Sequence, residues 1–268
     1  MKIKSKAPWI YMAVIMVITY IPIVLTVVYS FNESKITSIW GGFSLTWYEQ
    51  LFRDRDLAEA LRNSLVLAGL SCLSAVVIGT TGAIGMDRWK NRFNSVVSYF
   101  SLIPIMIPEI ILGMVFLAAF SLMNLPFGML TLVIAHTTFC VPYVFMTVRA
   151  RLAGMDHSTE EAARDLGATG LRTFWDITLP ALLPAIWSGV LLSFAMSFDD
   201  VVISIFVTGA TVNTLPIKIY TRMKTGVTPE INALATVLLA ATIAILLLAG
   251  ALGSQRGRAG KKEEELRR

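Results

Sequence analysis

Three acidic residues lie inside long apolar stretches of this sequence: Glu109, Asp199 and Asp200. A carboxylate costs about 2.5–3.5 kcal/mol at the centre of a membrane helix, so such residues face a cavity or a partner and not lipid. No lysine or arginine lies inside the same stretches to neutralise them. The three acids therefore predict a pathway that favours a cation. The alternative is that some of them are protonated or face the polar surface of a second subunit.

The composition indicates a membrane protein. Of its 268 residues, 55% are hydrophobic and 15% are charged, whereas about 25% of the residues in a soluble domain are charged. The net charge of +5 does not imply nucleic acid as a partner. Cys72 and Cys140 lack the spacing of a metal site, so we expect two buried thiols and no metal. His136 lies in another apolar stretch, where it is either a pathway ligand or, as we favour, hydrogen-bonded to a neighbouring helix.

Six stretches are long enough to cross a bilayer core of about 30 Å as helices. They cover approximately residues 8–31, 63–85, 95–120, 129–148, 182–207 and 231–252. The sequence therefore predicts an all-α integral membrane protein with six transmembrane helices in one domain, residues 8–252. Residues 1–7 are an N-terminal segment, residues 150–181 are a polar loop within the domain, and residues 253–268 are a charged tail that we expect to be disordered.

Basic residues are distributed unevenly between the polar segments. If the N-terminus is inside, the inner segments hold 3, 3, 4 and 6 bases, which is 16 of the 23 in the chain, and the outer segments hold 7. By the positive-inside rule, both termini and the loop at residues 150–181 then lie in the cytoplasm.

Prolines interrupt the third stretch directly before Glu109. Pro104 and Pro108 are expected to kink or break the helix and to free backbone carbonyls, which a membrane tolerates only beside protein or a water-filled cavity. Along straight helices, Glu109 and Asp199 lie about 21 and about 26 Å from the inner ends of their spans, in the outer half of the membrane. On one continuous helix, the side chains of Asp199 and Asp200 diverge by about 100°.

The polar loop contains the segment EEAARDLGATGLRTFWDITLP, residues 160–180, which has the pattern of two short helices. Ser158 and Glu161 have the spacing of a capping box and predict the start of the first helix. Gly167 would end it in a left-handed conformation, and Pro180 would end a second, amphipathic helix. Charged residues are expected on the outer faces: Glu160, Glu161, Arg164, Asp165, Arg172 and Asp176. Such a shape could dock into a groove of another protein, and the alternative is a solvated loop.

Seven positions of this segment form a pattern, namely Glu161, Ala162, Ala163, Gly167, Ile177, Leu179 and Pro180. The pattern resembles the EAA motif of permease subunits of type I ABC importers. In that family the loop is a coupling helix that lies in a groove of a separate ATPase subunit. The resemblance implies a type I importer permease fold and an ATPase-coupling role for these residues together with Glu160 and Asp165.

Longer motifs occur at residues 136–142, 197–209, 214–220 and 229–236. They resemble those of spermidine/putrescine-type permeases, except that many members are expected to have aspartate where this chain has Glu109. The resemblance implies a homologous second permease subunit, two ATP-binding subunits and a soluble extracytoplasmic substrate-binding protein as partners. It also implies a substrate pathway that contains Glu109, Ser197, Asp199 and Asp200.

No G-x-x-x-x-G-K-[ST] motif occurs, so we expect the chain to bind no cofactor and a partner ATPase to use the ATP. The expected protein is a multi-pass subunit of the bacterial inner membrane, not itself an enzyme, that imports a polyamine. One alternative is an ABC importer permease for another small organic solute, such as an aminophosphonate or an opine. A second is an autonomous secondary transporter or channel, in which the polar loop is only a linker.

Overall fold

The structure is a computed structural model that describes residues 7–35, 39–89, 94–224, 226, 229–244 and 247. Its regular structure is helical, and the described residues form no strand, only one isolated bridge between Asn32 and Phe43. The helices are α1 (Ala7–Tyr29), α2 (Thr46–Arg53), α3 (Arg55–Arg88), α4 (Asn94–Met106), α5 (Glu109–Leu122), α6 (Met129–Ala153), α7 (Ser158–Asp165), α8 (Gly170–Thr173), the π-helical turn η1 (Phe174–Thr178), α9 (Leu179–Asp199), α10 (Val202–Val207) and α11 (Leu215–Lys224). The chain forms two compact units, residues 56–220 and residues 1–55 with 221–268.

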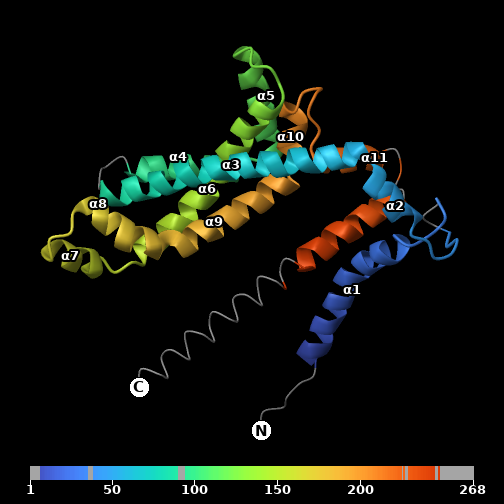
Figure 1. Ribbon diagram of the computed structural model, residues 1–268, viewed down its shortest axis with the longest axis horizontal. Coiled ribbons are helices and arrows are strands. Elements are labelled where there is room, and N and C mark those ends of the chain that lie inside the picture. Colours follow the sequence, from blue (N-terminus) through green and yellow to red (C-terminus); the bar gives the residue numbers. More distant parts are fainter. Residues whose placement is uncertain are drawn as a thin grey trace, which may run out of the picture. The chain divides into compact units, whose positions relative to one another are not determined.

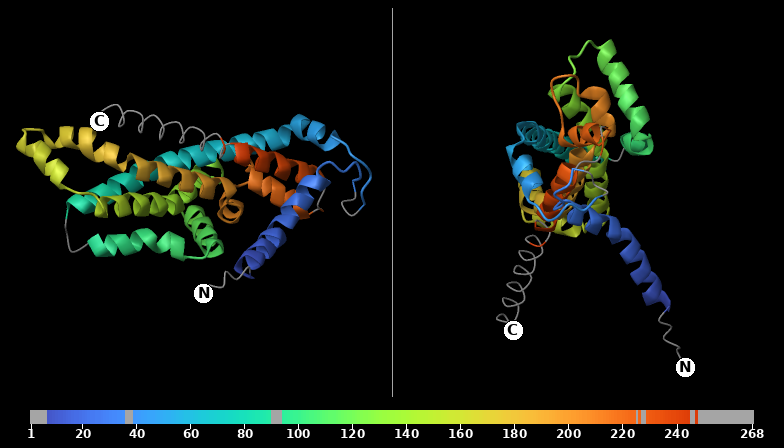
Figure 2. Two further views of the ribbon diagram at one scale, coloured as in Figure 1. Left: turned by 90° about the horizontal axis from the view of Figure 1, so that it is seen from below. Right: turned by 90° about the vertical axis from the view of Figure 1, so that its right-hand side faces the viewer.

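In the unit of residues 56–220, helix α6 is the centre, and α3 and α9 run beside it (Figures 1 and 2). Small residues permit the close approach. A Cβ added at Gly79 of α3 would meet Val144 at 2.9 Å, and one added at Gly189 of α9 would meet Thr147 at 2.8 Å. Helices in a membrane associate through such close packing because lipid is as apolar as their side chains. Gly79 and Gly189 therefore provide close packing, and the core is centred on α6.

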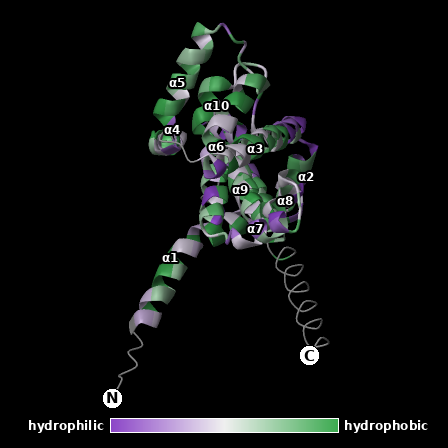
Figure 3. Cartoon of the chain, turned by 90° about the vertical axis from the view of Figure 1, so that its left-hand side faces the viewer, coloured by the Kyte–Doolittle hydropathy of each residue, from purple (hydrophilic) through white to green (hydrophobic). Residues whose placement is uncertain are grey.

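The third predicted span is broken as its prolines indicate. Helices α4 and α5 meet at an angle of 104° across a short break that contains Ile107 and Pro108. Proline has no backbone N–H and its ring clashes with the preceding turn, so a helix breaks readily there. Glu109 is consequently the first residue of α5, and its height cannot follow from one straight helix. Helix α5 is mostly hydrophobic (Figure 3) and packs on α10, where a Cβ at Gly113 would lie 2.5 Å from Phe206.

The fifth predicted span is not one continuous helix, and this expectation is wrong. Helix α9 ends at Asp199, Asp200 has an extended backbone with φ −66° and ψ 125°, and α10 begins two residues later. Because the φ of Asp200 is still a helical value, its Cβ keeps the direction expected on a helix, and only the chain after Asp200 turns away. The physical reason is that the Asp200 side chain binds the free amides at the start of α10, which replaces the helical hydrogen bonds lost at the break.

Among the residues that the structure describes, four helices are long and apolar enough to cross a membrane, and the bent pair α4 and α5 could make a fifth crossing. A shorter apolar helix, Pro229–Ala244, coincides with the sixth predicted span. The basic residues at positions 2, 4, 6, 90 and 92 and the tail at 253–268 lie outside the described residues.

The unit of residues 1–55 and 221–268 contains α1, α2 and the apolar helix Pro229–Ala244. Arg222 forms ion pairs with Asp54, which follows α2, and with Glu230. Burial lowers the pKa of the Arg222 guanidinium, but the hydrogen bond to Asp54 and the charge of Glu230 outweigh it and hold that pKa above its ordinary value. Trp47 of α2 is buried and donates from Nε1 to the Asn32 carbonyl at 2.7 Å. The polar segment after α1 therefore has a defined fold.

Candidate solute cavity and coupling surface

A cavity of about 330 Å³ lies where the break between α4 and α5 meets the break between α9 and α10. Both helix breaks and the middle of α6 contribute to its wall. The lining residues include three carboxylates and two aromatic rings one helical turn apart on α6: Glu109, Phe139, Tyr143, Asp199 and Asp200. The rest of the lining is mainly apolar. A cavity that combines an apolar wall with a few convergent charges is typical of a small-molecule site.

The carboxylates of Glu109 and Asp199 are available to a ligand. Both side chains are exposed, and neither forms a hydrogen bond or ion pair with any other residue that the structure describes. Tyr143, which is half-buried, lines the same cavity. Two free carboxylates beside aromatic faces can attract an ammonium group through charge and through the ring quadrupole. Glu109 and Asp199, which come from different predicted spans, are thus brought together in one cavity.

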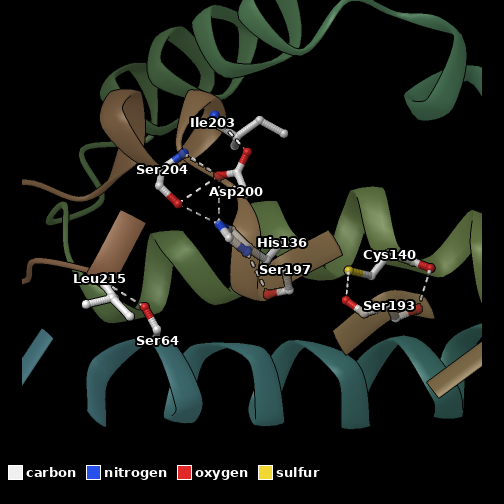
Figure 4. A network of polar contacts seen from close by, with 9 residues as sticks. All are labelled: Ser64, His136, Cys140, Ser193, Ser197, Asp200, Ile203, Ser204 and Leu215. Atoms are coloured by element: carbon white, nitrogen blue, oxygen red, sulfur yellow. Dashed lines mark hydrogen bonds and ion pairs between the residues drawn. The ribbon is translucent and has the colours of Figure 1, made fainter. Parts of the chain in front are cut away.

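Asp200 has a different environment. Its side chain is 5% exposed. Its carboxylate accepts hydrogen bonds from the Ile203 amide at 3.2 Å, the Ser204 amide at 2.8 Å and the Ser204 hydroxyl at 2.8 Å (Figure 4). His136 Nε2 lies 3.4 Å from the same carboxylate. Asp200 lines the cavity, but most of its hydrogen-bonding capacity is already used within the protein.

His136 is completely buried and binds two helices at once. Its Nδ1 lies 2.8 Å from the Ser197 hydroxyl on α9, and its Nε2 lies 3.0 Å from the Ser204 hydroxyl on α10 (Figure 4). The expectation that His136 bonds a neighbouring helix is confirmed. Ser197 is buried and is not among the residues that line the cavity, so it reaches the acids only through His136. No spacing in the sequence relates position 136 to positions 197 and 204.

Helix α7 begins close to the predicted residue, but the capping box is wrong. The residue before the helix is His157, which makes no side-chain cap, and Ser158 is already helical. The Asp156 carboxylate accepts instead from the Ser158 amide at 3.0 Å. This hydrogen bond is the main reason that the pKa of Asp156 lies below its ordinary value. An aspartate two residues ahead therefore satisfies the free amide that the serine hydroxyl was expected to serve.

Glu160 faces inward, which corrects its expected place on the outer face. It is buried and accepts from the Thr178 hydroxyl at 2.5 Å. Arg164 Nη2 lies 3.8 Å and His157 Nδ1 lies 4.0 Å from its second carboxylate oxygen. A buried carboxylate requires such partners because an unpaired charge is costly. Glu160 thus fixes α7 to the π-helical turn that leads into α9.

The elbow after α7 has the predicted conformation. Gly167 has φ +88°, and the Ala168 amide bonds back to the Ala163 carbonyl at 3.0 Å, which is the pattern of a Schellman ending. The helix that follows does not end at Pro180, so that expectation is wrong. The chain passes from α8 through η1 into α9, and the Leu179 amide bonds to the carbonyl of Phe174, five residues back. The wider π-helical spacing makes room for the ring of Pro180 at the start of α9.

Apolar side chains remain uncovered around this elbow. Leu166 is 89% exposed and Trp175 is 59% exposed. Exposed charged residues surround them, including Glu161 and Asp165. An exposed apolar group of this kind with a polar border is typical of a protein interaction site. Of the predicted coupling residues, Glu161, Ala162 and Asp165 are on the exposed surface, whereas Glu160 supports it from behind.

Similarity to known proteins shows the family of the chain. Residues 75–255 match the family of the binding-protein-dependent transport system inner membrane component. The chain belongs to this family. The permease is therefore a multi-pass subunit of an ABC importer in the bacterial inner membrane, and it is a transport subunit, not an enzyme.

Relatives with known names share about two fifths of the residues. The permease is 41% identical to the spermidine/putrescine transport system permease protein PotC of Haemophilus influenzae, over 89% of this chain and 93% of that protein. It is 40% identical to the putrescine transport system permease protein PotI of Escherichia coli, over 88% of this chain and 87% of that protein.

Solved structures support the fold. A bacterial ABC transporter that imports the acidic polysaccharide alginate superimposes with a TM-score of 0.70 at 13% identity, covering 92% of the permease and 94% of that chain. The MetNI methionine ABC transporter gives a TM-score of 0.61 at 19% identity, covering 73% of the permease and 93% of that chain. At such low identity the likeness is one of fold, and the permease has the all-α fold of type I ABC importers.

Proposed function

We propose that the chain is the transmembrane subunit through which an ABC importer takes up a polyamine such as putrescine or spermidine. The observation that carries the proposal is the pair of free carboxylates, Glu109 and Asp199, in one cavity with aromatic residues. A polyamine has ammonium groups separated by methylene chains, which match separated acids and an apolar wall. The names of the relatives with about 40% identity point to the same solutes.

The proposed topology has six transmembrane helices within residues 8–252 and both termini in the cytoplasm. The charge distribution supports it. In this arrangement the break between α4 and α5 lies within the third crossing, and Pro229–Ala244 is part of the sixth. Residues 1–7 and 253–268 are proposed to lie on the cytoplasmic side.

The proposed assembly contains a homologous second permease, two ATP-binding subunits and a soluble extracytoplasmic binding protein. The surface around Leu166 and Trp175 is proposed to lie in a groove of an ATP-binding subunit, with Glu161, Ala162, Ala163, Asp165, Gly167, Ile177, Leu179 and Pro180 forming or supporting it. The chain itself binds no cofactor, and the ATPase partner supplies the free energy. Because α7 is followed by α8, η1 and α9, and Gly170–Asp199 is one continuous span, movement of the ATP-binding subunit can reach the cavity along this span.

The test is uptake by the complete transporter in proteoliposomes. We expect ATP-dependent accumulation of labelled putrescine or spermidine that excess unlabelled polyamine abolishes and that an aminophosphonate does not affect. Glu109→Gln and Asp199→Asn together should abolish it, whereas Glu49→Gln, at an exposed acid on α2, should not. Uptake of an aminophosphonate or an opine in place of polyamine would contradict the proposal and leave the importer family unchanged.

A further inference from the structure

The break between α9 and α10 lies within an apolar stretch, so its backbone needs partners. A backbone group without a hydrogen bond in the hydrocarbon region costs several kcal/mol, and irregular backbone occurs there only beside protein or a cavity. The start of α10 obtains two partners from the Asp200 carboxylate, which accepts from the amides of Ile203 and Ser204. Asp200 is thus a cap for α10, and its charge is fixed in place.

One side chain from outside these two helices spans the break. His136, on α6, contacts Ser197 three residues before Asp200 and Ser204 four residues after it. Its ring is fully buried, and both ring nitrogens have partners (Figure 4). The ring therefore holds the last turn of α9 and the first turn of α10 at a fixed separation. Asp199 lies between the two points that it holds.

The hydrogen-bond directions define the role of Nε2 in the ring. The Ser204 hydroxyl donates its one hydrogen to Asp200, so its oxygen accepts from His136 Nε2–H. Nδ1 forms its hydrogen bond with the Ser197 hydroxyl. Every polar atom in the cluster therefore has a partner. A shorter or apolar side chain at position 136 leaves Ser204 and Asp200 without this donor.

We propose that His136 is a positioning residue, which holds the break between α9 and α10 so that the Asp199 carboxylate faces the solute cavity. It acts through Ser197, Ser204 and Asp200 and does not itself line the cavity. The division of labour between the two neighbouring acids follows: Asp200 is bound by the protein, and Asp199 is left for the solute. The transport consequence rests on the function proposed above, whereas the geometry of Asp199 does not.

Two amide replacements separate this role from a general need for a histidine. His136→Gln can place an amide N–H near the position of Nε2 and still donate toward Ser204 and Asp200. His136→Asn is shorter and reaches only the position of Nδ1, so it keeps the contact with Ser197 and loses the donor. Both replacements leave a polar side chain in the same site, which makes them matched controls for each other.

The position of Asp199 can be read by thiol labelling in the assembled transporter. Cys72 and Cys140, both buried, are first replaced by alanine, and Asp199→Cys is then treated with a small thiosulfonate reagent that carries an ammonium group. We expect His136→Asn to change the labelling rate at position 199 by tenfold or more and His136→Gln to change it by less than threefold. Glu109→Cys, at the start of α5, should be labelled at the same rate in all three backgrounds.

In the cysteine-containing parent, His136→Asn should also lower polyamine uptake per ATP hydrolysed by tenfold or more, and His136→Gln by less than threefold. Equal labelling at position 199 in both variants would overturn the proposal, as would an equal change at positions 199 and 109, which would indicate general disruption. If His136→Asn does not assemble, Ser197→Ala and Ser204→Ala each remove one partner of the ring and should change labelling at position 199 in the same selective way. If the labelling pattern holds but polyamine is not transported, the positioning role stands and the proposed solute is wrong.

Discussion

Asp199 and Asp200 are neighbours in the sequence with opposite surroundings in the fold. The first is exposed to the cavity, and the second is held by two amides and a hydroxyl. Removing a charge that only a ligand uses changes binding, whereas removing one that satisfies buried donors changes stability. Asp199 is therefore expected to act in solute binding, whereas Asp200 is expected to stabilise the start of α10.

Single amide substitutions at these positions test the difference. Asp199→Asn should lower uptake at subsaturating polyamine about tenfold, equivalent to about 1.4 kcal/mol, with an unchanged Tm of the purified complex. Asp200→Asn places an NH₂ group beside the amides of Ile203 and Ser204 and should cost about 1–3 kcal/mol of stability, seen as a lower Tm. An equal fall in Tm for both variants would contradict this assignment. Glu49→Gln, outside the cavity, is the control for both measurements.

At the scale of elements, α7 and the turn η1 form one structural piece. Glu160 joins them through Thr178, and Gly167 provides the left-handed residue at the elbow between them. The exposed residues Leu166 and Trp175 flank that elbow and take their positions from it. Gly167→Val changes the backbone at the elbow, and Thr178→Val removes the hydrogen bond to Glu160.

Gly167→Val should uncouple the transporter. Its φ of +88° is unfavourable for a β-branched residue, although an added Cβ would meet no atom within 4 Å, so the cost is in the backbone alone. We expect normal membrane insertion, with transport and binding-protein-stimulated ATP hydrolysis falling together at least fivefold. Gly167→Asn is the matched control, because asparagine tolerates the left-handed region, and it should retain most of the activity. Wild-type rates in Gly167→Val would mean that the elbow is not part of the coupling element.

Thr178→Val should loosen α7 without altering its exposed surface. Valine has nearly the shape of threonine but no hydroxyl, so the buried Glu160 carboxylate loses its hydrogen bond, at a cost of about 1–3 kcal/mol. Hydrogen exchange of the α7 amides should accelerate about tenfold, while the exchange of α3 amides is unchanged. Thr178→Ser keeps the hydroxyl and should behave as the wild type. If α7 exchanges equally fast in all three proteins, the Glu160 contact does not hold it.

At the scale of the whole molecule, the proposed topology determines which face meets which partner. Native Cys72 and Cys140 are buried, so an added cysteine can be labelled selectively. Thr169→Cys, at the elbow, should react with a membrane-impermeant thiol reagent only in inside-out vesicles. Glu49→Cys, on α2, should react only when the reagent is added to the extracytoplasmic side of intact cells. Labelling of position 169 from outside would reject both the topology and the coupling role of α7.

The sequence alone predicted the class of the protein and much of its site, for simple physical reasons. Apolar stretches of about 20 residues without charges are typical of membrane-spanning helices, and a glycine after a short amphipathic helix predicts a left-handed ending, as Gly167 has. The prolines before Glu109 predicted the break between α4 and α5. Carboxylates are so costly in lipid that their positions in apolar stretches were enough to assign Glu109 and Asp199 to a cavity.

The tertiary structure decided which neighbour each of these groups meets. Helical periodicity predicts a continuous helix through Asp199 and Asp200. The break is stabilised by the Asp200 cap on α10 and by His136, which lies on α6, far away in the sequence. The inward direction of Glu160 likewise depends on Thr178, eighteen positions later. Local conformational propensity acts over only a few residues. A buried carboxylate, in contrast, is stabilised by a hydrogen-bond donor that the packing brings within about 3 Å. The identity of that donor is set by the fold as a whole.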